Sequence, residues 1–138
     1  RAGVASAELS RQRERLRYME AALDETPGAD PALYQELEAV EVAFDGVALR
    51  LQGDRVRSSL NQATVPSVSG RLGSVSSGHW GTRMEPTETQ RRNVEIAESG
   101  LAEVEGELNG LITGRLQRLE EALAAAGAPW TPGRRVGG

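Results

Sequence analysis

The feature that most constrains the fold is a regular seam of apolar residues between positions 31 and 52. Its members alternate at spacings of four and three residues: Leu33, Leu37, Val40, Phe44, Val47 and Leu51. This spacing returns to one face of an α-helix every two turns. Asp30 can cap the free amides at the start of such a helix, and Pro31 suits its first position. We therefore predict a helix over 31–52, with Phe44 buried against two neighbouring helices.

The residues before this seam predict another helix, over 4–25. Leu9, Leu16 and Leu23 recur every seven residues, and Met19 lies between them. The same segment contains the arginine-rich run "RQRERLR", which an anionic partner would contact. Neighbouring glutamates offset these charges and favour a solvated face instead.

A third, longer helix is predicted over 88–126. Thr87 and Gln90 have the spacing of a capping box, and Gly127 is a natural stop. The apolar stripe between these ends consists of Val94, Ala97, Leu101, Val104, Leu108, Leu111, Ile112, Leu116, Leu119 and Leu123. At about 1.5 Å per residue this helix is roughly 58 Å long, against roughly 33 Å for the first. Two shorter helices therefore leave part of it uncovered.

The glycine- and serine-rich connection over 61–86 is the candidate to cover that part. Val65, Val68, Leu72 and Val75 have helical spacing, although each glycine in a helix costs up to ~1 kcal/mol. An ordered, partly helical segment is favoured over an extended loop, because long structureless loops are uncommon in compact domains. The predicted fold is all-α: a three-helix antiparallel bundle over 1–127 with this connection between its second and third helices, and a tail over 128–138.

Three glycines of the third helix, Gly106, Gly110 and Gly114, are spaced by four residues. They lie on the face opposite Leu108. One hypothesis is that the small residues between 69 and 78 pack against this ridge and sandwich the helix. The ridge would otherwise dock a second copy or another domain, or reflect only a glycine-rich composition.

Composition excludes several function classes. The net charge of −4 provides no basic field for nucleic acid. The chain has no cysteine and one histidine, which rules out a His/Cys zinc site or paired Glu-x-x-His motifs. No nucleophile elbow or phosphate-binding glycine loop is present, and no apolar run approaches the ~20 residues of a membrane span. We expect no catalytic residue, metal or cofactor, and no membrane insertion.

The stretch "PSVSGRLGSVSSGHWGTR" over 66–83 holds the remaining candidates for a binding site. Arg71, His79, Trp80 and Arg83 would surround a carbohydrate or an anion. The favoured interpretation is that Trp80 is buried and anchors this segment to the bundle. Trp130, in the tail, is likewise predicted to fold back onto the end of the third helix rather than bind a partner.

Several short motifs together resemble one protein family. They are "PSVSGRLG", "SSGHWGT", "PTETQRRNVEIA" and "GAPWTPGR". The four motifs follow a helical hairpin in this order. This arrangement is similar to the C-terminal helical region of a family of large bacterial proteins. The main part of those proteins is a β-propeller with Asp-box (bacterial neuraminidase) repeats, similar to the sortilin propeller, and they are commonly described as glycosyl hydrolases.

The resemblance implies an accessory domain that follows a propeller in an exported protein. Its implied partners are its own upstream β-propeller or a second copy of the chain. "SSGHWGT" lacks the aspartate of an Asp-box, so no active-site residue of the propeller is carried over. The expected function is a non-catalytic helical module for packing or assembly. The alternative is a carbohydrate- or anion-binding module that uses the 66–83 segment.

Overall fold

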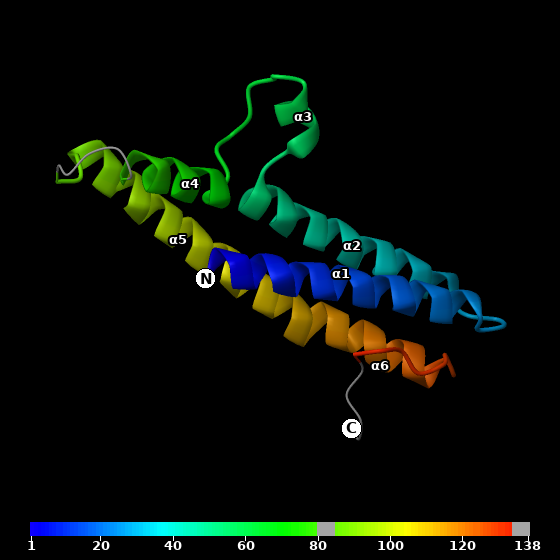
Figure 1. Ribbon diagram of the computed structural model, residues 1–138. Coiled ribbons are helices and arrows are strands. Elements are labelled where there is room, and N and C mark those ends of the chain that lie inside the picture. The colour runs from blue at the N-terminus through cyan, green and yellow to red at the C-terminus, as the bar shows by residue number, and fades with distance from the viewer. Residues whose placement is uncertain (80–84, 134–138) are drawn as a thin grey trace. The chain divides into compact units, whose positions relative to one another are not determined.

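The structure is a computed structural model that describes residues 1–79 and 85–133 (Figure 1). Within these ranges the chain is all-α, without strands, and its helices pack against each other. The elements are α1 (Ala2–Asp24), α2 (Pro31–Gln52), α3 (Arg55–Ser59), α4 (Val68–His79), α5 (Glu88–Gly110), the π-helix η1 (Leu111–Leu116) and α6 (Gln117–Ala125). The predicted ends of the long helices agree with these bounds to within two residues.

The chain divides into two compact units. Unit 1 comprises residues 1–6 and 46–107, and unit 2 comprises residues 7–45 and 108–138, of which those up to 133 are described. The boundary falls within α1, α2 and α5, so each of these helices contributes residues to both units. Each unit has its own buried core and its own ion pairs between helices.

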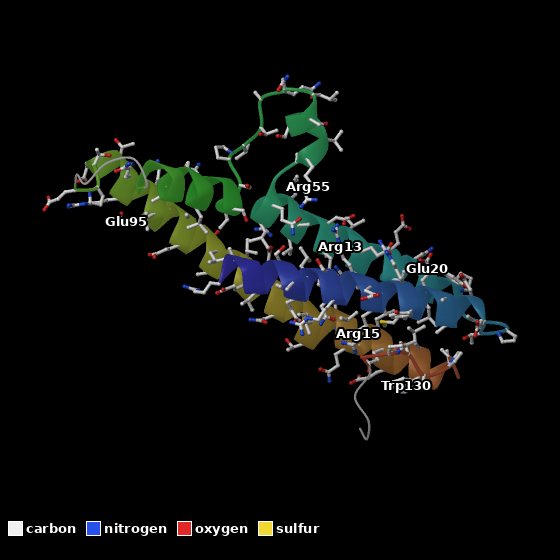
Figure 2. The ribbon with its side chains drawn as sticks, in the orientation of Figure 1. Arg13, Arg15, Glu20, Arg55, Glu95 and Trp130 are labelled. Carbon is white, nitrogen blue, oxygen red and sulfur yellow. The ribbon has the colours of Figure 1, made fainter. Side chains whose placement is uncertain are left out.

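Unit 2 has a core of large aliphatic side chains around Phe44. Its buried apolar residues are Leu9, Leu16, Met19, Ala22, Leu23, Leu37, Val40, Phe44, Leu108, Leu116, Leu119 and Leu123. Phe44 is fully buried, as the seam predicts. Arg13 of α1 pairs with Asp45 of α2, and Arg15 of α1 pairs with Glu120 of α6. Figure 2 shows these two arginines on opposite sides of α1.

Unit 1 has a smaller core. Its buried apolar residues are Ala5, Val47, Ala48, Leu51, Val68, Ala97, Leu101 and Val104. Arg1 pairs with Glu105 of α5 at 2.6 Å. The Gln52 Nε2 at the end of α2 donates a hydrogen bond of 2.6 Å to the Ser6 Oγ of α1. These contacts join the parts of α1, α2 and α5 that belong to this unit.

The predicted helix ends are confirmed by their hydrogen bonds. The Asp30 carboxylate accepts from the Ala32 amide at 2.9 Å, and Thr87 and Gln90 form the reciprocal capping box at 2.9 and 3.3 Å. After α6, Gly127 adopts a φ of +81°, and the Ala128 amide donates to the Leu123 carbonyl at 3.0 Å. This is a Schellman ending, which glycine favours because it has no side chain to clash at positive φ.

The connection between α2 and α5 is partly helical, with α4 as its main helix (Figure 1). Gly53 ends α2 with a φ of +83°, and Asp54 caps α3 by accepting from the Arg57 amide at 3.0 Å. The Ser67 Oγ accepts from the Gly70 amide at 3.0 Å and so caps the start of α4.

The predicted third helix is interrupted by the π-helix η1, which the apolar pattern explains. Its buried residues follow spacings of three and four, except that Leu108 and Leu116 are eight residues apart. Eight residues of regular α-helix would turn Leu116 about 80° away from the face of Leu108. The i→i+5 bonding of a π-helix takes up the extra residue. Leu111 and Ile112, which both fit the stripe in the sequence, are each half-buried.

The hypothesis that small residues of the 66–83 segment sandwich the third helix is wrong for the residues that the structure describes. A Cβ atom added at Gly106, Gly110 or Gly114 would meet nothing within 4 Å. Instead, α4 approaches α5 at Gly100, where an added Cβ would lie 3.2 Å from the Val68 Cγ2. The physical reason is that α4 buries the apolar side that begins with Val68, and its small-residue side remains exposed.

Candidate functional site

The sequence placed a candidate site at Arg71, His79, Trp80 and Arg83. Of these, only Arg71 has a described side chain; it is half-buried on α4. His79 ends α4, but its side chain lies outside the described residues, as do Trp80 and Arg83. The predicted burial of Trp80 therefore stays a prediction.

Arg71 lines a cavity of about 670 Å³ that lies wholly within unit 1. We call this cavity the unit 1 groove. Its walls come from the end of α2, from α3, from residues 63–67, from the start of α4 and from the middle of α5. The lining residues are Leu49, Arg50, Asp54, Arg57, Ala63, Thr64, Val65, Pro66, Ser67, Val68, Arg71, Ile96, Gly100, Glu103 and Val104.

The apolar lining of the unit 1 groove is aliphatic and open to solvent. Leu49, Val65 and Ile96 are 53, 87 and 43% exposed, whereas Val68 and Val104 are buried. Sequence reasoning missed Leu49 and Ile96, although a signal was available. Both are large apolar residues that lie outside the buried seams of their own helices. Leu49 is two positions before the buried Leu51, and Ile96 is one position before the buried Ala97.

The charged side chains that line the groove are Arg50, Arg57, Arg71, Asp54 and Glu103. Arg50 pairs with Glu107 of α5, and Arg57 pairs with Asp54 at 3.6 Å. In the described part of the chain Arg71 has no ion-pair partner. The lining has three arginines and two carboxylates, and Glu107, which pairs with Arg50, balances the remaining positive charge.

Trp130 lies in the tail beyond α6 (Figure 2). This side chain is 60% exposed, whereas the next residue, Thr131, is buried. The expected packing of Trp130 onto the end of the third helix stays a prediction. The tail also approaches α1, because a Cβ atom added at Gly133 would lie 3.4 Å from the Arg15 Cδ.

Two hydrogen-bonded pairs outside the groove contain side chains with a shifted pKa. The hydrogen bond from Arg1, with the attraction of its charge, lowers the pKa of Glu105, and the same bond raises the pKa of Arg1. The Tyr34 hydroxyl donates to the Asp24 carboxylate at 2.9 Å, and this bond raises the pKa of Tyr34. Each pair joins a surface residue to a neighbouring helix or turn.

Among the described side chains, no group of three or more His, Cys, Asp or Glu residues is arranged to hold a metal ion. None of the described helices combines the length and apolar character needed to cross a membrane.

Comparisons with protein-family models, curated proteins and solved structures give no match to this chain. The side chains of the unit 1 groove are therefore the best guide to function.

Proposed function

We propose that this chain is a non-catalytic helical module that binds another protein surface through unit 1. In this proposal it is an accessory domain of a larger β-propeller protein of the glycosyl hydrolase-like family that it resembles. The partner is that propeller or a second copy of the chain. The helices α1 and α2 and the path α5–η1–α6 form an antiparallel three-helix bundle that supports the binding surface.

The observation that carries the proposal is the convergence of exposed aliphatic side chains on one cavity. Leu49, Val65 and Ile96 come from three separate segments of unit 1 and line the same groove. Removing aliphatic surface from water is favourable by about 25 cal/mol per Å². Exposed aliphatic side chains that line one groove together offer a partner an apolar surface to cover. Contact with a partner would remove these side chains from water.

The alternative, a carbohydrate- or anion-binding module built on 66–83, is supported by Arg71, which lines the groove without an ion-pair partner among the described residues. Among the described residues, the lining contains no aromatic side chain on which a sugar ring would stack. The aliphatic walls therefore favour a protein partner. Glycan-array binding that Arg71→Ala abolishes, with the fold intact, would favour the alternative.

The test uses site-specific photo-crosslinking in the full gene product that contains this chain. A photoreactive residue replaces Val65 in the groove or, as the matched control, Val42, which is also an exposed valine but belongs to unit 2. The chain has no lysine, so a photoreactive residue is preferable to an amine-specific reagent.

We expect position 65 to cross-link to the propeller or to a second copy, and position 42 to give little product. Mass spectrometry of the cross-linked peptides would identify the partner. Equal cross-linking from both positions, or none from position 65, would contradict the proposed function.

A further inference from the structure

We infer that the unit 1 groove receives an aliphatic segment of a partner protein that carries a carboxylate, and that Arg71 binds this carboxylate. The inference rests on the proposed protein-binding function and adds the chemistry of the partner.

The position of Arg71 on α4 is fixed by its backbone. The Ser67 carbonyl accepts from the Arg71 amide at 3.0 Å, and the Ser67 hydroxyl caps the same helical turn. Val68, one turn from Arg71, is buried beside Gly100 of α5. The Arg71 Cα is therefore held at the edge of the groove by the cap of α4 and by its packing on α5.

Arg71 differs from the two other arginines of the groove because it has no ion-pair partner among the described residues. Arg50 and Arg57 already pair with carboxylates of this chain, but Arg71 pairs with none in the described ranges. A guanidinium has five N–H donors, and two of them match the two oxygens of a carboxylate. An incoming carboxylate would find these donors available without breaking an existing ion pair.

The charge of the groove also differs from that of the whole chain. Its three arginines are balanced by Asp54, Glu103 and the Glu107 that pairs with Arg50, whereas the whole chain has a net charge of −4. An acidic segment therefore meets less repulsion at the groove than the net charge of the chain implies, and Arg71 is the point of attraction. Such a charge selects the position and orientation of a charged partner more than it adds affinity.

The open walls favour a protein segment over a small aliphatic carboxylate such as a fatty acid. A small-molecule site buries most of its ligand, typically about 70–90% of the ligand surface. Leu49, Val65 and Ile96 line the groove and all remain exposed to solvent, so the groove leaves one side of an occupant uncovered. An amphipathic helix or strand needs only one covered face, because its own polar face remains in water.

The experiment is selection from a random peptide display library against the whole chain. The baits are wild type, Arg71→Glu and the matched control Arg92→Glu. Arg92 is an exposed arginine of α5 in unit 1, outside the groove and without an ion pair in the described part of the chain. Thermal unfolding checks each bait, and Arg71→Gln removes the charge without reversing it if Arg71→Glu does not fold.

We expect wild type and Arg92→Glu to enrich peptides that combine aliphatic residues with Asp or Glu. Arg71→Glu should instead enrich peptides with Lys or Arg. For one selected acidic peptide, Arg71→Glu should weaken the Kd at least about tenfold, and Arg92→Glu less than about twofold. The affinity of wild type should fall with added salt.

Selected peptides without acidic residues, or equal affinity for wild type and Arg71→Glu, would overturn the inference. Val65→Asp separates that result from failure of the proposed function. If it abolishes peptide binding that Arg71→Glu leaves intact, protein binding stands and only the acidic partner is wrong. If neither variant changes peptide binding, the proposed function of the groove and the inferred acidic partner are both wrong. Direct binding of oleate that depends on Arg71, with no enriched peptide, would assign the groove to small aliphatic carboxylates and also overturn the inference.

Discussion

Units 1 and 2 use their apolar residues in different ways, although α1, α2 and α5 contribute to both. Among the described residues, unit 2 buries twelve apolar side chains, of which one is alanine, and unit 1 buries eight, of which three are alanine. Three of the four large apolar residues that unit 2 exposes are aromatic: Tyr18, Tyr34 and Trp130. All six large apolar residues that unit 1 exposes are aliphatic: Val4, Leu49, Val56, Leu60, Val65 and Ile96.

The difference agrees with a division between the stability of the fold and the proposed binding of a partner. Tyrosine and tryptophan have polar groups that tolerate water, whereas an exposed leucine or isoleucine has none. Unit 2 therefore buries most of its aliphatic residues in a core, whereas unit 1 exposes several of them to solvent. The stability of the fold should depend more on unit 2, and its recognition more on unit 1.

The largest expected effect is at the centre of the unit 2 core. Phe44→Ala should lower the free energy of unfolding by about 3–5 kcal/mol, because it removes a fully buried ring and leaves a cavity. Leu101→Ala in unit 1 should cost less, about 2 kcal/mol, because the smaller core can collapse around it. Urea unfolding measures both. A loss below about 1 kcal/mol for Phe44→Ala would show that this core does not dominate stability.

The ion pairs sharpen the comparison. The side chains of Arg15 and Glu120 in unit 2 are each 15% exposed, whereas those of Arg50 and Glu107 in unit 1 are 50 and 46% exposed. Glu120→Gln should therefore cost about 2 kcal/mol, because it leaves a mostly buried arginine without its charge partner. Glu107→Gln should cost less than about 0.5 kcal/mol, because solvent screens that pair. Equal losses in urea unfolding would remove this distinction between the units.

Two glycine substitutions test where the backbone is closely approached. Gly110→Ala should stabilise the chain by about 0.5–1 kcal/mol, because an added Cβ meets open space and alanine is the better helix former. Gly100→Ala in unit 1 should give no such gain, because its Cβ would press against Val68 at 3.2 Å. Thermal unfolding distinguishes the two. Destabilisation by Gly110→Ala would revive the hypothesis that the glycine ridge packs against another segment.

The smallest effect is the pH dependence of the Arg1–Glu105 pair in unit 1. Because the folded pKa of Glu105 lies below its ordinary value of 4.5, the pair stabilises the fold above that pH. This stabilisation is lost as the pH falls through the lowered folded pKa. The difference in Tm between wild type and Glu105→Gln should therefore shrink on acidification below about pH 5. A difference that grows on acidification would contradict the assigned ion pair.

Local signals in the sequence predicted much of the fold. The ends of α2 follow from Asp30, Pro31 and the apolar seam, and the start of α5 follows from the capping box of Thr87 and Gln90. These signals act within one or two turns, so they are readable from neighbouring residues. The sequence does not predict the π-helix, because Leu111 and Ile112 fill the interval between Leu108 and Leu116 with the spacing of a regular helix.

The candidate site was less predictable, because it depends on contacts between segments that are distant in the sequence. Sequence reasoning selected Arg71 but grouped it with His79, Trp80 and Arg83, its neighbours in the chain. The groove instead joins Arg71 to Leu49 and Ile96. Which apolar residues remain exposed depends on where α4 meets α5, and that depends on the contact of Val68 with Gly100.

The π-helical turn η1 also bears on how the length of this chain can change during evolution. Deleting one residue from a regular α-helix rotates every later side chain by about 100°, which turns a buried stripe toward solvent. Between Leu108 and Leu116 the helix already contains one residue more than two regular turns hold. Loss of one codon there would restore α-helical bonding and keep Leu116, Leu119 and Leu123 facing the core. The gene can therefore shorten at η1 without rebuilding unit 2.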